Sequence, residues 1–311
     1  MASIFYYPWY STEGHDGAYR HWQQSGRRPP ADIASSFYPL RGVYSSGSRA
    51  VLQAHMREIK AAGIGTVVTS WWGRGSLEDR RLGAVLAAAR KMRLLVAAHL
   101  EPYPWRSIES IEDDLQYLVI RGIREVYVYQ PTDFTTGAWA SLNRRTTGVV
   151  LLAQTGKVGF AAAARFRGVY TYDVLVYGGG SFARICAQAR AAGLVCAPSV
   201  GPGYRAERAG SDRRLKARKN GATYDSMWQA ALRARASRVT ITSYNEWHEG
   251  TQIEPARSGR SGYFSYLGAF GGPRALAPCS YLLRTAQWVR AFAGGQSLVG
   301  QPLATRGRAG C

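Results

Sequence analysis

The two carboxylates best suited to acid–base chemistry are Glu246 and Glu249, which lie three residues apart after a β-rich run. A glycosidic bond is hydrolysed by two such groups, one that protonates the departing oxygen and one that acts on the other side of the sugar. The same spacing occurs in surface turns, where one Glu caps the next helix. Trp247 and His248 between the carboxylates, and Gly250 after them, make this stretch richer than an ordinary turn. We therefore interpret the pair as candidate catalytic groups.

Aromatic and polar side chains also stand where other β-rich runs end. They are Tyr7, Trp9, Trp71, Trp72, His99, Glu101 and Tyr172, with Asn245 directly before the pair. The carboxyl ends of parallel barrel strands meet at one mouth, where aromatic faces and carboxylates would form a carbohydrate-binding cleft. Successive side chains of a strand point to opposite faces, so one of Trp71 and Trp72 should lie in the core and the other in the cleft. His21, in a long loop, and Trp247 and His248, between the two carboxylates, are further candidates for the cleft wall.

A repeated alternation of strand-like and helix-like segments indicates how these residues are positioned. Eight β-rich runs lie at 3–10, 65–72, 94–100, 125–130, 148–154, 168–173, 194–200 and 238–245, and amphipathic stretches at 49–62, 77–92, 108–121, 182–192, 224–234 and 281–292. This pattern predicts an α/β fold with a single (β/α)8 TIM barrel over residues 1–311, although a helix within 131–145 is poorly marked. An open doubly wound sheet is the alternative, but no Gly-rich loop follows the first run. Long loops at 11–47 and 201–221 follow strands and should lie on the catalytic face.

Composition sets bounds on partners and compartment. The net charge of +20 suggests an anionic partner, but no recognised nucleic-acid motif accompanies it. Cys186 and Cys196 fall on a predicted helix and strand, which favours buried thiols, while a Cys279–Cys311 disulfide is possible. No apolar window reaches the length of a membrane span, and the start of the chain has no leader pattern. Any export signal would lie outside this sequence, so a secreted or cell-envelope location and a cytoplasmic one both stay open.

Several segments, taken in order along the chain, resemble the motifs of glycoside hydrolase family 99, the endo-α-1,2-mannosidases and endo-α-1,2-mannanases. The most specific segment is SYNEWHEGTQIEPA at residues 243–256. The others are YYPWY (6–10), HW (21–22), YPLRGVYSS (38–46), AGIGTVVTSWWG (62–73), HLEPYP (99–104), GVYTYD (168–173), PSVGPGY (198–204) and YDSMW (224–228). One short string alone would be weak, whereas the joint match over residues 6 to 256 is specific.

The resemblance implies an endo-acting hydrolase that retains anomeric configuration and uses no metal or other cofactor. It implies that the substrate's own 2-hydroxyl is the nucleophile and that a 1,2-anhydro sugar is the intermediate. Glu246 would be the base on that hydroxyl, Glu249 the acid on the departing oxygen, and Glu101 a ligand of the reacting sugar's hydroxyls. Residues that would line or orient the site are Tyr7, Trp71, His99, Tyr172 and Asn245, with Tyr204 in the PSVGPGY segment. The expected partner is an α-mannan or a mannose-containing oligosaccharide, bound by a monomer with no nucleic acid.

The loop RAERAGSDRRLKARK at residues 205–219 departs from the family pattern, in which acidic residues commonly follow PSVGPGY. A basic loop beside the cleft suggests the hypothesis that the substrate carries negative charge. If it does, an Arg213→Ala, Arg214→Ala double substitution should raise KM for an anionic mannoside more than for a neutral one. Steady-state kinetics on both substrates would check this, and equal effects would contradict the hypothesis.

Three other functions stay open at this point. A relative of the family acting on a different or anionic α-linked glycan would keep the same mechanism. A non-catalytic carbohydrate- or anion-binding barrel would keep the aromatic residues but not need both Glu246 and Glu249, which are present here. A nucleic-acid-binding protein is supported by charge alone, and its retention on DNA should fall steeply with salt.

Overall fold

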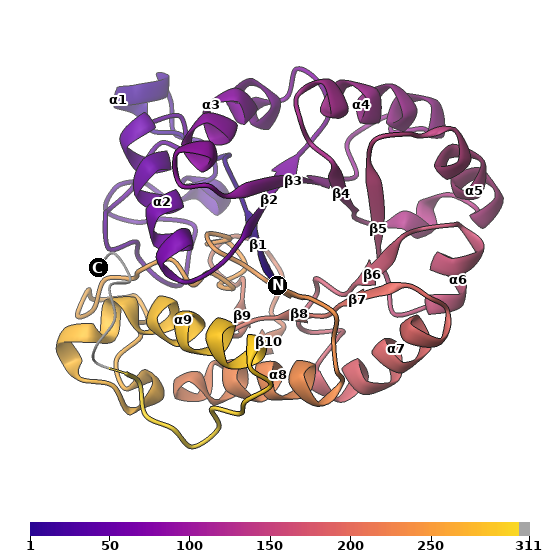
Figure 1. Cartoon of the computed structure of the whole chain (residues 1–311). Coiled ribbons are helices and arrows are strands. Elements are labelled where there is room, and N and C mark those ends of the chain that lie inside the picture. Colours follow the sequence, from indigo (N-terminus) through magenta and orange to yellow (C-terminus); the bar gives the residue numbers. More distant parts are fainter. Residues whose placement is uncertain (305–311) are drawn as a thin grey trace.

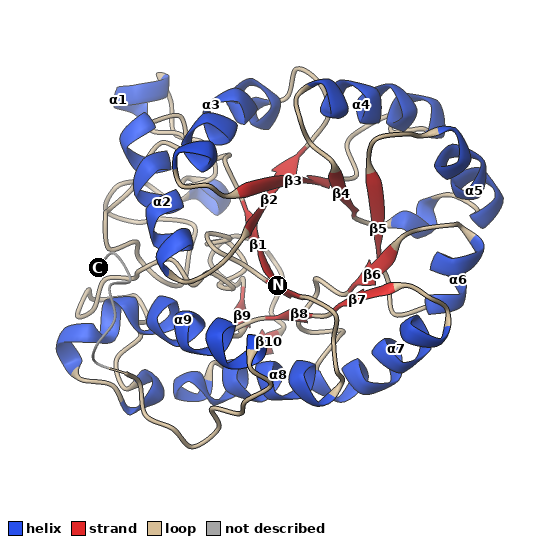
Figure 2. Cartoon of the chain, viewed as in Figure 1, coloured by secondary structure: helices blue, strands red, loops and turns tan. Residues whose placement is uncertain are grey.

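A ring of parallel strands surrounded by helices forms the core of the computed structural model, which describes residues 1–304 (Figures 1 and 2). The strands are β1 (Ala2–Tyr6), β2 (Thr66–Trp71), β3 (Leu95–Leu100), β4 (Glu125–Val128), β5 (Val150–Gln154), β6 (Gly168–Tyr170), β7 (Val195–Ala197), β8 (Ser199–Val200) and β11 (Val239–Ile241). The helices that follow them are α2 (Arg49–Ala61), α3 (Leu77–Lys91), α4 (Ile108–Ile120), α5 (Thr136–Arg145), α6 (Val158–Ala163), α7 (Gly179–Ala191), α8 (Ala222–Arg233) and α9 (Ser280–Ala293).

The ring closes through a strand that is divided by a proline. The order of the strands is β7-β6-β5-β4-β3-β2-β1-β11-β8, and every pairing within it is parallel. β7 pairs with β6, and β8 pairs with β11 on the other side. Pro198 separates β7 from β8 and has no N–H for the ladder, so the two segments act as one barrel strand. The result is eight strand positions, each followed by a helix, which confirms the predicted (β/α)8 barrel.

Two buried apolar clusters follow from the alternation of side chains along the strands. The smaller cluster fills the inside of the barrel and takes a residue from most of the strands: Phe5, Val68, Ala97, Tyr127, Leu152, Tyr170 and Ala197, topped by Tyr7 and Tyr172. The larger cluster lies between the strands and the helices and includes Ile4, Val67, Val126 and Val169. The barrel is therefore a packed core, and chemistry is confined to its ends.

Several strands end before the predicted positions, and two helices, α5 and α6, were not predicted clearly from the sequence. At β1 the backbone of Tyr7 leaves the ladder and pairs with a side chain, since its N–H donates to Asn245 Oδ1 at 2.8 Å and its carbonyl accepts from Nδ2 at 2.9 Å. α5 forms in the poorly marked stretch, with Thr135 accepting from the N–H of Ala138 at its start. α6 has only six residues, too few for a helical period to be read.

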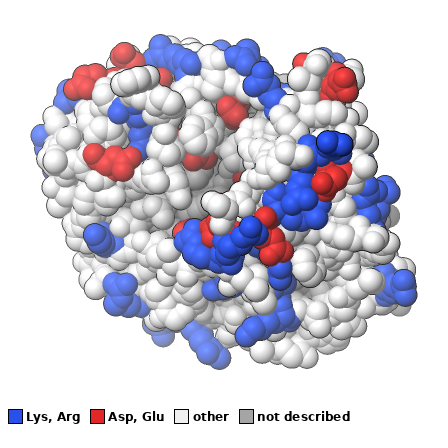
Figure 3. All heavy atoms as spheres, turned by 180° about the vertical axis from the view of Figure 1, so that it is seen from behind, with Lys and Arg blue, Asp and Glu red and all other residues white. Residues whose placement is uncertain are grey.

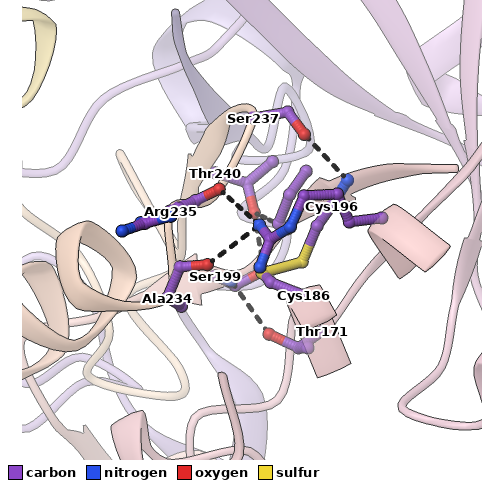
Figure 4. Close-up of a disulfide and its surroundings, with 10 residues drawn as sticks. Thr171, Cys186, Cys196, Ser199, Ala234, Arg235, Ser237 and Thr240 are labelled. Carbon is purple, nitrogen blue, oxygen red and sulfur yellow. Dashed lines mark hydrogen bonds between the residues drawn. A yellow bond between two sulfur atoms is a disulfide. The ribbon is translucent and has the colours of Figure 1, made fainter. Parts of the chain in front are cut away.

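The expectation of buried thiols at Cys186 and Cys196 was wrong, because the two residues form a disulfide (Figure 4). Cys186 lies in α7 and Cys196 in β7, with their Cα atoms 5.2 Å apart. The bond fastens α7 to the strand that follows it, while Arg190 on the same helix donates to the carbonyl of Arg235 at 3.2 Å. The possible Cys279–Cys311 pairing includes Cys311, which lies outside the described residues.

Replacing both Cys186 and Cys196 by Ala should lower the free energy of unfolding by about 3 kcal/mol, because an open loop of about ten residues gains entropy in the unfolded chain. Urea unfolding monitored by circular dichroism measures this. A reductant should destabilise the wild type toward the level of the double variant and leave the variant itself unchanged. Equal stability with and without reductant in the wild type would contradict the bond's contribution.

Candidate active site

Glu246 and Glu249 lie on a tight turn between β11 and the following segment, at the carboxyl end of the barrel. Glu246 is buried, with its N–H donating to Ser243 Oγ at 2.8 Å and its carboxylate accepting from the N–H of His248 at 3.1 Å. Glu249 is half-buried. The turn ends at Gly250, which has φ +62, and a side chain there would meet the carbonyl of Arg205 at 2.8 Å. Glycine is required by both the left-handed backbone and the close approach.

Burial and repulsion by neighbouring carboxylates raise the pKa of both carboxyl groups. The pKa of Glu249 is raised to about 8, first by burial and then by Asp173 and Glu101, with Arg214 opposing. Burial raises the pKa of Glu246 well above 4.5, and repulsion by Glu249 adds to this. Backbone N–H groups of His248 and Glu249 oppose the rise at Glu246 by stabilising its charged form. Both carboxyl groups therefore keep a proton to a higher pH than an ordinary glutamate does, as a catalytic acid requires, while the backbone N–H groups at Glu246 are placed to stabilise its carboxylate form.

Glu101 faces the pair from the end of β3 and is fixed by two hydrogen bonds. One of its oxygens accepts from Ser70 Oγ at 2.8 Å and lies 2.9 Å from His99 Nδ1. The other nitrogen of His99 lies 2.9 Å from the hydroxyl of Tyr170. The barrel interior thus orients Glu101 and leaves its second oxygen without a hydrogen bond from these groups. A carboxylate held in this way can accept hydrogen bonds from hydroxyl groups of a ligand.

Two tyrosines bridge the mouth between β1 and β6. The hydroxyls of Tyr7 and Tyr172 are hydrogen-bonded to each other, and burial raises the pKa of both. Tyr172 has a left-handed backbone with φ 44. It is held there by its N–H, which donates to Ser199 Oγ at 2.7 Å, and by its carbonyl, which accepts from Thr242 Oγ1 at 3.0 Å. This costly conformation places the Tyr172 ring in the mouth.

A stack of aromatic rings forms another wall. The rings of Trp9 and His21 are 4.5 Å apart and nearly parallel at 9°, and His248 lies 5.3 Å from His21. His248 Nε2 is 2.8 Å from the carbonyl oxygen of His21, which ties the first loop to the catalytic turn. Burial lowers the pKa of His21 to about 3 and that of His248 to about 4, so both rings are neutral at pH 7.

Three of the predicted site residues are fully buried and support the mouth through contacts in the protein interior. Trp71 donates from its indole to Asp79 at 3.0 Å, outside the barrel wall, which makes Trp72 the half-buried member of that pair on the other face. Asn245 binds the backbone of Tyr7, and Trp247 donates to Glu254 at 2.8 Å. The expectation that Trp71 and Trp247 line the cleft is therefore corrected, because their indoles face partners in the protein interior.

Behind Trp247 lies a buried ionic network centred on Glu254. Its oxygens lie 3.0 Å from Arg41 Nε and 3.1 Å from His55 Nε2, and accept from the hydroxyl of Tyr44 at 2.7 Å. Burial alone would raise the pKa of Glu254, but His55 and Arg41 lower it below its ordinary value. Glu254 and His55 thus have structural roles.

Three of the seven basic residues of the loop at 205–219 form ion pairs. Arg205 pairs with Glu207 at 2.7 Å, Arg214 pairs with Asp212 at 2.7 Å, and Arg208 pairs with Asp32 of the first loop. Figure 3 views the molecule from the side opposite to Figure 1 and shows intermixed basic and acidic side chains beside a central hollow. This pairing compensates part of the charge on which the hypothesis of an anionic substrate depends.

Tyr204 links this loop to the catalytic turn. Its hydroxyl donates to Asp212 at 2.7 Å, and the adjacent N–H of Arg205 donates to the carbonyl of Glu249 at 2.7 Å. Tyr204, Arg214 and Glu249 line one small cavity together with Tyr172 and Asp173. The sequence offered Arg214 as one charge of a basic loop and did not place it beside Glu249, since a charge within such a loop carries no positional signal.

Tyr129, just after β4, is a site residue that the strand-end rule should have found. It is half-buried, its ring lies 5.4 Å from those of His99 and Tyr172, and burial, Glu249 and Glu101 raise its pKa. Among residues 1–304, no cluster of three or more His, Cys, Asp or Glu side chains is arranged to hold a metal ion. Within the same residues, no helix is long and apolar enough to cross a membrane.

Comparison with known proteins gives a consistent result over most of the chain. The model of Glycosyl hydrolase family 99 matches residues 1–132 and 134–294. A glycoprotein endo-alpha-1,2-mannosidase-like protein of Homo sapiens is 32% identical, with 93% of this chain and 75% of that protein covered. Glycoprotein endo-alpha-1,2-mannosidase of Mus musculus is 29% identical, with coverage of 93% and 74%. The solved GH99 endo-alpha-mannosidase from Bacteroides thetaiotaomicron has a TM-score of 0.84 and 29% identity, covering 95% of this chain and 98% of that one.

Proposed function

The chain belongs to glycosyl hydrolase family 99 and is a glycoside hydrolase, and we propose that it cleaves internal α-1,2-mannosidic bonds in mannan or mannose-containing glycans with retention of anomeric configuration. The observation that carries the proposal is the pair of Glu246 and Glu249 at the barrel mouth beside Glu101, where burial raises the pKa of both members of the pair. We also take residues 1–311 as one catalytic domain.

In the proposed first step, Glu246 takes the proton of the sugar's 2-hydroxyl while O2 of the same sugar attacks C1. Glu249 donates its proton to the departing oxygen, so the C1–oxygen bond to the leaving sugar breaks as the C1–O2 bond forms. A 2-hydroxyl is a poor nucleophile unless a base removes its proton during attack. Glu101, fixed by Ser70 and His99, would hold the hydroxyls of the reacting sugar.

In the proposed second step, Glu249 is a carboxylate and takes a proton from water, whose oxygen attacks C1 and opens the 1,2-anhydro ring. Glu246 returns its proton to O2. Two inversions at C1 give overall retention. Tyr7, Tyr172, Trp9 and Trp72 would supply the walls against which the sugar rings pack.

The activity should depend on pH through both carboxyl groups. Glu249 must be protonated, and its pKa in the free enzyme is about 8, so kcat/KM should hold below that pH and fall as the pH rises through about 8. Glu246 must be ionised, and its pKa is raised by burial, so the acidic limb should lie above the ordinary 4.5. Measuring kcat/KM from pH 4 to pH 10 checks both limbs. A profile flat between pH 7 and pH 10 would contradict the assignment of the acid.

The proposed function is tested by following the hydrolysis of an α-1,2-linked mannan oligosaccharide by NMR. The α-anomer should appear first, before mutarotation gives the mixture. The β-anomer as first product would contradict retention, and no hydrolysis would contradict the proposed linkage while leaving membership of the family in place.

A further inference from the structure

A second cavity opens at the amino-terminal ends of the strands, on the opposite side of the barrel from the catalytic pair. Its volume is about 710 Å³, compared with about 250 Å³ for the cavity beside the basic loop. It lies beneath the starts of β2, β3 and β4 and beside the last turns of α3 and α4, which are neighbours in Figure 1. A volume of this size is in the range that small ligands occupy.

The rim of this cavity carries concentrated positive charge. Its charged lining residues are Arg90, Arg93, Arg121, Arg124 and Arg238, with Glu125 as the only acid among them. Glu125 is already paired with Arg238. Within residues 1–304, the other four arginines have no carboxylate in ion-pair distance. Several guanidinium groups around one hollow repel each other, and an anion bound between them would relieve that repulsion.

Helix ends explain only part of this charge. Arg90 lies in the last turn of α3 and Arg121 directly follows α4, positions where a cation is favourable beside the helix dipole. Arg93, Arg124 and Arg238 instead lie just before β3, β4 and β11, outside any helix. An arginine therefore lies on the rim at the start of each of three strands, and interaction with a helix dipole does not account for these three arginines.

The floor of the cavity is apolar. Leu86, Leu94, Leu95 and Val96 line it, and Leu95 is 65% exposed although it begins a barrel strand. An exposed leucine on the floor and arginines on the rim would suit a ligand that has a hydrocarbon chain for the floor and a negatively charged group for the rim. Inorganic phosphate or a polar polyanion would satisfy the rim and leave this floor in water.

We propose that this cavity binds a single-chain amphiphilic anion, in which a carboxylate, sulfate or phosphate group is held by Arg93 and Arg124 and the hydrocarbon chain lies on Leu95. Guanidinium groups bind such anions through paired hydrogen bonds. The site is independent of the proposed hydrolysis, because its residues lie at the other end of the barrel from Glu246 and Glu249.

Calorimetry of the full chain with dodecyl phosphate, kept below its micelle concentration, tests the proposal. We expect one binding site per chain and no saturable binding of dodecyltrimethylammonium, which has the same chain and the opposite charge. Arg93→Ala, Arg124→Ala should weaken binding at least tenfold. Arg57→Ala, Arg184→Ala removes two exposed arginines of α2 and α7 and should leave affinity within about twofold.

A second variant, Leu95→Glu, tests the floor with one exposed position and should weaken binding to a similar extent. Both variants should keep the wild-type melting temperature and mannoside hydrolysis, so a loss of affinity is separable from a loss of folding. Equal affinity in all variants, or equal affinity for inorganic phosphate and dodecyl phosphate, would overturn the proposal. So would binding to phosphatidylglycerol vesicles without saturable binding of the monomer, which would indicate a membrane-facing surface instead.

Discussion

Substituting Glu249 by Gln should reduce kcat on an α-1,2-linked mannan oligosaccharide by about 10³- to 10⁴-fold, and Glu246→Gln should have an effect of similar size. Gln keeps the shape of the side chain but can neither donate the acidic proton nor accept one from a hydroxyl. Glu207→Gln, on the same face but paired with Arg205, is the matched control and should change kcat less than about threefold. Initial rates by product quantification provide the measurement.

The two variants should be distinguishable with an activated substrate. A 4-nitrophenyl mannobioside has a leaving group that departs without protonation, so it should restore much of the first-step rate of Glu249→Gln. It should not rescue Glu246→Gln, because attack by the 2-hydroxyl still needs a base. Rescue of Glu246→Gln and not of Glu249→Gln would show that the two roles are exchanged.

The second large effect concerns stability. Glu254→Gln should lower the free energy of unfolding by about 3–5 kcal/mol, because it removes the buried charge that pairs with the half-buried Arg41 and disrupts the hydrogen bond to His55. A loss of this size corresponds to a fall in Tm of roughly 10 °C. Calorimetry or circular dichroism melting measures it. Catalysis well below Tm should fall much less than in the catalytic variants, since Glu254 contacts Trp247 and not the reacting carboxylates.

An exposed carboxylate is the appropriate control for Glu254. Glu112 forms a surface ion pair with Arg145, and Glu112→Gln should leave Tm nearly unchanged because water solvates the remaining guanidinium of Arg145. If Glu254→Gln melted at the wild-type temperature, the network would orient Trp247 and its neighbours without stabilising the fold.

The alternation of β-rich runs and amphipathic stretches was sufficient to predict the barrel, because each strand is flanked by turn residues and each long helix has a readable period. It was insufficient at α6, where six residues are too few to show a period. It also could not show that Cys186 and Cys196 meet, because the pairing depends on how α7 packs back on β7. Apolar surroundings alone favoured free thiols.

For the site, the strand-end rule placed Glu101, Tyr7, Tyr172 and the glutamate pair at one mouth, as the structure has them. Their assigned roles are still predictions. Side-chain direction could not be read in the same way, since Trp71 and Trp72 differ only by one step of the strand. The position of Arg214 beside Glu249 depends on the fold of a loop with no regular pattern.

The two long loops of the catalytic face also limit how this enzyme can be altered. Arg208 of the second loop is bound to Asp32 of the first, His248 is bound to the backbone of His21, and Arg205 is bound to the backbone of Glu249. The loops therefore form a single interlocked unit with the catalytic turn. Grafting one loop from a relative would leave broken contacts in the other and disturb the acid itself, so a change of specificity by loop exchange should succeed only when both loops are transferred together.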